Sequence, residues 1–373
     1  MKNFQMKFLP FFMLLGIVLL SQCTVFKKQA KKSELPVIAY YAGDAKSIDR
    51  YPVDKLTHII YSFLHLKGNR LAIDNQRDSM TLRKLVSLKA DHPNLEVLVA
   101  LGGWGGCETC SEVFSTARGR QGFASSTKQL LQKFDADGID LDWEYPAIQG
   151  PPGHPYSDED TRNFTLLVRE LRKELGNEYE ISFAAGAFKR FFDHSVTWNQ
   201  VMPLVDRVHL MTYDFVSGGS TQTGHLSSLY STDQQTRSAD YAVRYLDSLG
   251  VPKEKMVIGA AFYVRMWEEV PPKNNGLYQH AQYHRSLKYR DLDEYLIDYP
   301  GFIKYQDQEA KAPYLYHPGK RLFVTYDDSL SVALKTRYAL DNNLGGFMFW
   351  ELGGDEPQNG LLESIYKTKE EAQ

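Results

Sequence analysis

Long apolar runs and an excess of one charge are both missing from this chain of 373 residues. Its 43 lysines and arginines and 46 acidic residues give a formal net charge of −3, and no long basic run occurs, so no nucleic-acid partner is expected. The most apolar segment, residues 8–20, is too short to span a membrane and contains Pro10. Because Lys2 and Lys7 precede this segment, it is interpreted as an export signal.

Cysteine is equally scarce, with three residues in the whole chain. Residues 20–23 resemble a bacterial lipoprotein box, in which Cys23 becomes the lipidated first residue. Residues 1–22 would then be a lipoprotein-type signal peptide, and residues 23–35, which are rich in lysine, a solvated tether. We expect an exported, membrane-anchored lipoprotein that acts as a monomer. Ordinary signal-peptidase cleavage to a secreted protein is the alternative.

The other two cysteines, Cys107 and Cys110, are separated by two residues in a Gly-rich loop. In an exported protein a local disulfide is the favoured interpretation. A zinc site would need two more ligands, and a thioredoxin-type redox motif would need a different fold. His280 and His284 have the spacing of a helical metal-binding pair but lack the glutamate of HExxH, so they are interpreted as surface histidines. No metal and no cofactor are expected.

The most informative segment is residues 137–145, where acidic residues recur at every second position of an apolar stretch. Asp140, Asp142 and Glu144 would share one face of a β-strand, with Ile, Leu and Trp on the other. Three carboxylates so close together cannot all ionise without cost, so one of them should have a raised pKa. A protonated carboxyl beside an ionised one is what a glycosidic leaving group needs. The alternative, a solvated charged edge strand, is disfavoured by the apolar opposite face.

Strand and helix patterns alternate along the chain. Eight strands are predicted at 36–41, 56–64, 95–101, 138–144, 180–186, 207–213, 256–262 and 345–350. Helices are predicted at 78–91, 117–136, 158–176, 233–249 and 329–343. Eight such repeats predict an α/β fold of the (β/α)8 TIM-barrel type, with its active site at the carboxyl ends of the strands.

The mature chain is roughly a hundred residues longer than a bare barrel of about 250. Most of the excess lies between the seventh strand and the seventh helix, where we expect an α+β insertion at 264–326. The barrel itself would then consist of residues 36–263 and 327–368.

The acidic segment also resembles a known family. Asp137, Asp140, Asp142 and Glu144 fit the DxxDxDxE pattern of family 18 glycoside hydrolases, the chitinases and their relatives, and the resemblance runs from about residue 36 to about residue 366. It implies a TIM barrel with this motif on its fourth strand. It also implies that the substrate's acetamido group is the nucleophile, that Glu144 is the acid, that Asp142 orients the acetamide and that Asp140 tunes Asp142. Asp137 is interpreted as structural.

Further segments match the family's binding residues. Met211 to Asp214 fit its MxYD motif, in which Tyr213 would bind the acetamide oxygen, and Trp350 at the end of the eighth strand would form the floor of the pocket. The resemblance assigns the remaining sugar contacts to Tyr40, Phe63, Trp104, Tyr263 and Arg265. Residues 305–316 and 321–328 resemble the α+β insertion of one chitinase subfamily. Ala100 stands where the family often has a serine, so Asp140 should need another partner, and the pH profile should shift.

These observations predict a chitinase that cleaves β-1,4 bonds in chitin or chito-oligosaccharides with retention of configuration. One alternative is an endo-β-N-acetylglucosaminidase acting on glycoprotein glycans or peptidoglycan, which would use the same acids. Another is a chitin-binding lectin without activity, although such proteins typically lose the acid and Glu144 is present. A metal-dependent barrel enzyme would normally draw its acidic ligands from several strands rather than one.

Overall fold

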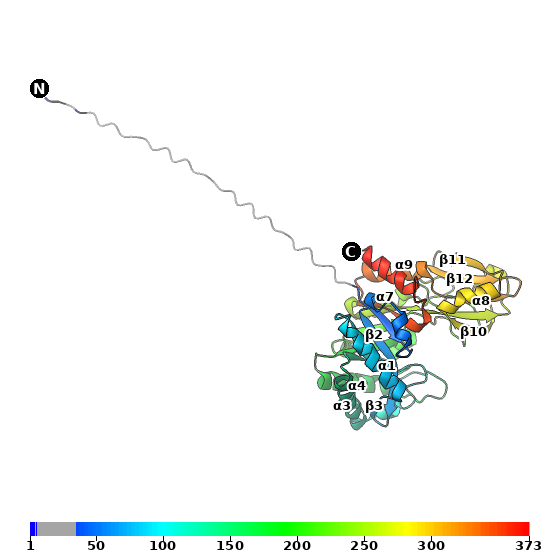
Figure 1. The fold of residues 1–373 in the computed structure, drawn as a ribbon, viewed down its shortest axis with the longest axis horizontal. Helices are drawn as coiled ribbons and strands as arrows, with labels where there is room; N and C mark the ends of the chain where they lie inside the picture. Colours follow the sequence, from blue (N-terminus) through cyan, green and yellow to red (C-terminus); the bar gives the residue numbers. More distant parts are fainter. Residues whose placement is uncertain (4, 6–34, 373) are drawn as a thin grey trace. The chain divides into compact units, whose positions relative to one another are not determined.

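A computed structural model describes residues 1–3, 5 and 35–372 of the chain (Figure 1). Cys23, with nearly all of the predicted signal peptide and tether, lies outside these residues. Within the described part, no helix is long and apolar enough to cross a membrane.

Eight parallel strands form a closed barrel, which confirms the predicted fold. The sheet runs in the order β1-β14-β8-β7-β6-β5-β4-β2, and pairing of β1 with β2 closes it. Its strands are β1 (Val37–Tyr41), β2 (His58–Lys67), β4 (Glu96–Gly102), β5 (Gly138–Asp142), β6 (Glu180–Gly186), β7 (Arg207–Met211), β8 (Met256–Ala261) and β14 (Gly346–Trp350). The short β3 (Arg70–Ala72) pairs antiparallel with the end of β2.

Side-chain alternation along the strands separates two cores. One face of each strand packs against the surrounding helices. Trp143, directly after β5, continues this face and packs against Phe114 and Phe164, with ring centroids 5.5 and 6.4 Å away. The other face points into the barrel and carries a smaller apolar cluster that includes Ile60 and Leu98. The helices are α1 (Gln76–Ser87), α2 (Cys110–Ser115), α3 (Ala117–Phe134), α4 (Asp160–Leu175), α5 (Lys189–His194), α6 (Trp198–Val201), α7 (Ala239–Ser248), α9 (Ser329–Asp341) and α10 (Leu361–Glu370).

The insertion between β8 and α9 forms a second, antiparallel sheet in the order β10-β9-β13-β12-β11. Its elements, yellow to orange in Figure 1, are β9 (Tyr263–Glu268), β10 (Gln282–Lys288), α8 (Leu292–Asp298), β11 (Ile303–Asp307), β12 (Ala312–His317) and β13 (Leu322–Thr325). His284 therefore lies on a strand rather than a helix, where its imidazole pairs with Glu268 at 3.0 Å.

Several element boundaries differ from the predictions; β2 runs from His58 to Lys67 instead of 56–64, for instance, and α1 ends at Ser87 instead of 91. The helix predicted from residue 233 begins at Ala239, because the Ser238 hydroxyl caps it by accepting from the Tyr241 N–H, while Gln235 upstream bonds to a neighbouring loop. Strands β5 and β7 each end two residues before the predicted end. Glu144 and Tyr213 therefore follow their strands instead of ending them.

Candidate active site

A cavity of about 960 Å³ opens at the carboxyl ends of the barrel strands. Ten of the predicted site residues line it: Phe63, Trp104, Asp142, Glu144, Met211, Tyr213, Asp214, Tyr263, Arg265 and Trp350. The other two, Tyr40 and Asp140, are buried in the barrel interior. The structure thus brings all the predicted residues to one end of the barrel, in two layers.

Asp140 is the centre of the deeper layer. Its carboxylate accepts hydrogen bonds from the Tyr40 hydroxyl at 2.9 Å and the Ser182 hydroxyl at 2.7 Å. His209 Nδ1 lies 2.8 Å from the Tyr40 hydroxyl and 3.4 Å from Asp140 Oδ1. Ala100 is the register partner of Asp140 on β4, so a serine there would face the same carboxylate. Ser182 and Tyr40 supply the hydroxyls that Ala100 cannot.

Burial raises the pKa of both carboxyls in the upper layer. Glu144 is 9% exposed, and burial, assisted by the charge of Asp214, raises its pKa to about 7 even though a hydrogen bond with Tyr145 lowers it. The pKa of Asp142 is also raised, first by burial and then by the charges of Glu144 and Asp140. Asp142 Oδ1 has no hydrogen-bond partner among the described residues. The site therefore presents a carboxyl that can hold a proton near neutral pH beside a second one that is open to a ligand.

Two glycines at the end of β4 allow the chain to pass close to Asp142. Gly102 and Gly103 have φ of +106° and +80°, in the left-handed region. A Cβ on Gly102 would lie 2.3 Å from the carbonyl oxygen of Asp142, and the Gly103 N–H donates to that oxygen at 2.9 Å. A Cβ on Gly103 would lie 2.4 Å from the Phe63 ring. Any larger residue would push the loop away from the acids.

Residues from the insertion fix Asp214 after β7. Arg265 forms a two-pronged ion pair with it, donating from Nε at 2.7 Å and from Nη2 at 2.6 Å, and the Tyr263 hydroxyl donates to the same carboxylate at 2.6 Å. Both residues line the cavity, but their polar groups are directed at Asp214. Tyr213 packs edge-on against Tyr263, and burial raises its pKa well above the usual value.

Aromatic rings form two separate surfaces in the cavity. The Trp350 indole stacks on Phe63 with centroids 5.4 Å apart and an interplanar angle of 18°, and Tyr40 lies 5.9 Å from it. Trp104 is 64% exposed and meets Tyr145 edge-on at 6.4 Å. Flat apolar surfaces of this kind suit the faces of sugar rings. A disulfide joins Cys107 and Cys110 in the loop that carries Trp104.

Sequence reasoning missed several residues of the site. These are Tyr145, Phe188, Arg237, Tyr283, Lys288 and Glu351 in the cavity, and His209 beneath it. His209 could have been predicted, because it lies two residues before Met211 on β7 and its side chain therefore points into the barrel as well. Tyr145 follows Glu144 directly. Phe188, Arg237 and Glu351 lie outside the strands, and Tyr283 and Lys288 lie on β10 of the insertion, where no strand was predicted.

In TIM-barrel enzymes the active site lies at the carboxyl ends of the strands. The carboxyl groups and aromatic rings of this barrel lie at the same end, so the fold and the cavity define a TIM-barrel enzyme. Residues 36–355 match the sequence model of the family described as "Glycosyl hydrolases family 18". The chain belongs to this family.

Similar proteins come from several bacteria. Chitinase A1 from Niallia circulans is 34% identical over 312 residues, which cover 77% of this chain and 44% of the relative. A solved family 18 N-acetylglucosaminidase from Paenibacillus barengoltzii is 37% identical with a TM-score of 0.82, covering 90% of this chain and 99% of that one. The chitinase ChiW from Paenibacillus sp. str. FPU-7 is 34% identical with a TM-score of 0.83, covering 90% and 42%. This chain therefore spans less than half the length of two of these three proteins.

Proposed function

We propose that the protein is a chitinase that hydrolyses β-1,4 bonds between N-acetylglucosamine residues with retention of configuration. The observation that carries the proposal is the pairing of Glu144, whose pKa burial raises to about 7, with the neighbouring Asp142, whose Oδ1 is buried without a hydrogen-bond partner among the described residues. Membership of the family and the likeness to chitinase A1 support the substrate class.

The first step breaks the glycosidic bond. Asp142 accepts the N–H of the substrate's acetamido group and the Tyr213 hydroxyl donates to its oxygen, which aligns that oxygen with C1. The acetamido oxygen attacks C1 as the bond from C1 to the leaving oxygen breaks, and Glu144 gives its proton to the leaving oxygen. The product is an oxazolinium ion, whose positive charge Asp142 stabilises. No covalent bond forms between a protein group and the sugar, as in substrate-assisted family 18 enzymes.

The second step restores the enzyme. Glu144, now ionised, takes a proton from a water molecule that attacks C1 on the face from which the first product left. The bond from C1 to the acetamido oxygen breaks and the acetamide reforms. Two inversions at C1 give net retention. Asp140, held by Tyr40 and Ser182, lies two residues before Asp142 on β5 and tunes it, since its charge helps to raise the pKa of Asp142.

A defined chitin hexamer tests the reaction. Trimers among the first products indicate internal cleavage, whereas dimer and tetramer alone would also fit release of disaccharides from one end. Glu144→Gln should abolish all products while hexamer binding persists. A thiazoline mimic of the oxazolinium ion should inhibit competitively, and an oligomer with a free amine at the cleaved sugar should not be cut there. Efficient cleavage next to a free amine would contradict the mechanism. Binding without turnover by the parent protein would instead indicate a lectin.

A second candidate is the release of single N-acetylglucosamine units, favoured by the likeness to the Paenibacillus barengoltzii N-acetylglucosaminidase. The hexamer assay separates the two, because monosaccharide and pentamer as the first products identify this activity. High-mannose glycopeptide and peptidoglycan, assayed in parallel, test the remaining glycan substrates. We further propose that the chain is a monomer exported to the cell envelope and anchored through Cys23, which the position of this cysteine after an apolar run supports.

A further inference from the structure

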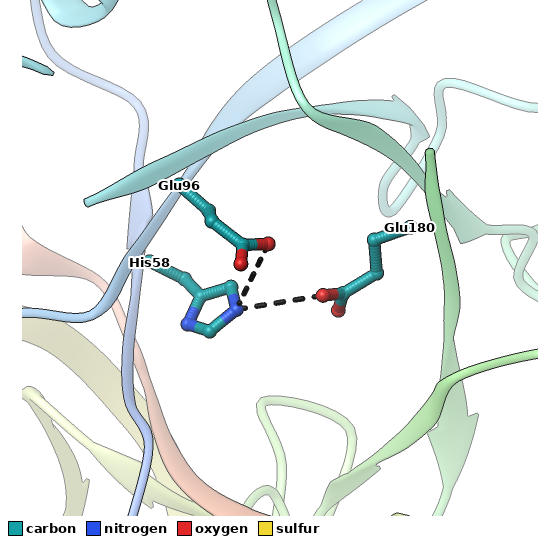
Figure 2. Close-up of side chains that lie close together, drawn as sticks. All are labelled: His58, Glu96 and Glu180. Atoms are coloured by element: carbon teal, nitrogen blue, oxygen red, sulfur yellow. Dashed lines mark ion pairs between the residues drawn. The ribbon is translucent and has the colours of Figure 1, made fainter. Parts of the chain in front are cut away.

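The end of the barrel opposite the cavity holds a second polar cluster. His58, Glu96 and Glu180 are the first residues of β2, β4 and β6, and their side chains converge in Figure 2. Their positions continue the inward alternation that carries Asp140 and Ser182 higher up the barrel. The proposed hydrolysis uses none of these three residues, since it takes place at the other ends of the strands.

The distances within this cluster do not fit a set of hydrogen bonds. His58 Nε2 lies 3.5 Å from Glu96 Oε2 and 3.4 Å from Glu180 Oε2, whereas charge-assisted N–H···O bonds measure about 2.7–2.9 Å. His58 is 4% exposed, yet among the described residues its Nε2 has no hydrogen-bond partner, and neither has Glu180 Oε1. A buried imidazole nitrogen thus points between two carboxylates without bonding to either.

The neighbouring residue orients this imidazole. The Thr57 hydroxyl accepts from the Val37 N–H at 2.9 Å and donates its own proton to the Val37 carbonyl at 3.0 Å. The same hydroxyl lies 2.7 Å from His58 Nδ1, and this contact holds the ring so that Nε2 is directed at the two carboxylates. When Nδ1 carries the only ring proton, Nε2 directs a lone pair at the two carboxylates. A positive species between these groups, either a second ring proton or a metal ion, would then give all three a partner.

We propose that His58, Glu96 and Glu180 bind a divalent transition-metal ion, with Zn²⁺ as the best fit. One imidazole and two carboxylates are ligands that zinc accepts, with bonds of about 2.0–2.2 Å. In a tetrahedron with such bonds the ligand atoms lie about 3.4 Å apart. The two nitrogen–oxygen distances, 3.4 and 3.5 Å, match this edge, and all three ligand atoms lie within 4.8 Å of one another. Water would take the fourth position.

The Thr57 contact is the kind of outer-shell hydrogen bond that fixes a metal-binding histidine. Because the three ligands come from separate strands, the ion would tie the amino-terminal ends of β2, β4 and β6 together. At this end of a barrel such a site serves stability rather than catalysis.

Arg207, the first residue of β7, sets a limit on affinity. Its guanidinium donates to Glu180 Oε2, the same oxygen that lies 3.4 Å from His58 Nε2, and cancels one negative charge of the cluster. The three ligands and Arg207 together carry a net charge of −1 when His58 is neutral, so the site should bind the ion less tightly than it would without the arginine. Arg207→Gln should therefore tighten zinc binding.

The test uses the full chain, stripped with a chelator and titrated with Zn²⁺ by calorimetry and by thermal unfolding. We expect one ion per chain at this site and a rise in Tm of a few degrees. Glu96→Gln is the key variant, since the Glu96 side chain is 48% exposed and its loss should not disturb folding. It should weaken binding at least about tenfold and abolish the rise in Tm. Glu254→Gln, an exposed glutamate at the same end of the barrel, is the matched control and should behave as the parent.

Co²⁺ provides an independent readout, because a tetrahedral nitrogen and oxygen site gives visible absorption that His58→Asn should remove. If the parent binds no Zn²⁺, or binds it as tightly after Glu96→Gln as before, the proposal is overturned. The positive species is then a proton on His58. Zinc held by the acids of the cavity would persist in the Glu96→Gln protein and is distinguished in this way.

Discussion

Removing the ionisable group of Glu144 should make the protein more stable at neutral and alkaline pH, at the same time as it abolishes turnover. Glu144→Gln keeps the shape of the side chain but removes the titrating carboxyl. Burial of that carboxyl raises its pKa from 4.5 to about 7, so ionising it lowers the stability of the folded parent.

The sign and size of this stability difference follow from proton linkage. Between pH 4.5 and 7 the unfolded chain loses this proton while the folded chain keeps it, so the stability of the parent falls as pH rises. One pKa unit corresponds to about 1.36 kcal/mol, which places the full effect near 3 kcal/mol above pH 7. Below pH 4.5 both states are protonated and the effect disappears. The advantage of the variant should therefore appear between pH 4.5 and 7 and remain constant above that.

Thermal unfolding of parent and variant from pH 4 to 9 measures this difference. The gap in Tm should be smallest at pH 4 and reach several degrees by pH 8. Glu112→Gln, at an exposed glutamate, is the control and should show no such gap. A Tm gap that is the same at pH 4 and pH 8 would refute the assignment of a buried, proton-holding carboxyl to Glu144. In activity assays the parent should lose its general acid as pH rises through about 7.

Four other changes give distinct results. Arg265→Lys cannot reproduce the two-pronged ion pair with Asp214, so kcat/KM on chito-oligosaccharides should fall about tenfold or more. Unchanged kinetics would contradict a role of this ion pair in catalysis. Trp104→Ala removes an exposed ring at the cavity, so KM for polymeric chitin should rise severalfold with kcat nearly unchanged; a fall in kcat alone would argue against a binding role. His209→Leu removes the imidazole from the buried network below the acids, and we expect a slower kcat and a displaced pH profile, whereas an unaltered profile would make the residue purely structural. The Cys23→Ala protein should leave the membrane fraction and should not be labelled by fatty acid. Unchanged association with the membrane would contradict the lipoprotein proposal.

Local patterns along the chain predicted most of the barrel. All eight parallel strands lie where alternation and apolar content place them, and four of the five predicted helices begin within two residues of the predicted start. The exception is α7, because an intervening loop held by Gln235 delays it to the cap at Ser238. Helix caps depend on which backbone groups a loop leaves free, and the pattern of apolar residues does not contain that information.

The acids of the site were equally accessible from the sequence. A period of two places Asp140 and Asp142 inside the barrel whatever surrounds them, since side chains of a strand alternate by geometry. The replacement of a serine by Ala100 was visible as well. The need for another partner of Asp140 was predicted, but its identity was not, because the hydroxyls that bind Asp140 come from Tyr40 and Ser182, which lie 100 and 42 residues away in the chain.

By itself, the sequence determined the barrel, the inward line of carboxyls and the family, because these depend on short-range periodicity and on a local motif. Tertiary structure decided the charge states and the partners. Many elements together bury Glu144 and so raise its pKa. Arg265 reaches Asp214 only because the insertion folds back over the barrel. The cluster of His58, Glu96 and Glu180 likewise exists only because closing the sheet brings the beginnings of three strands together. Such long-range encounters depend on the closed geometry of the barrel, which no single stretch of residues encodes.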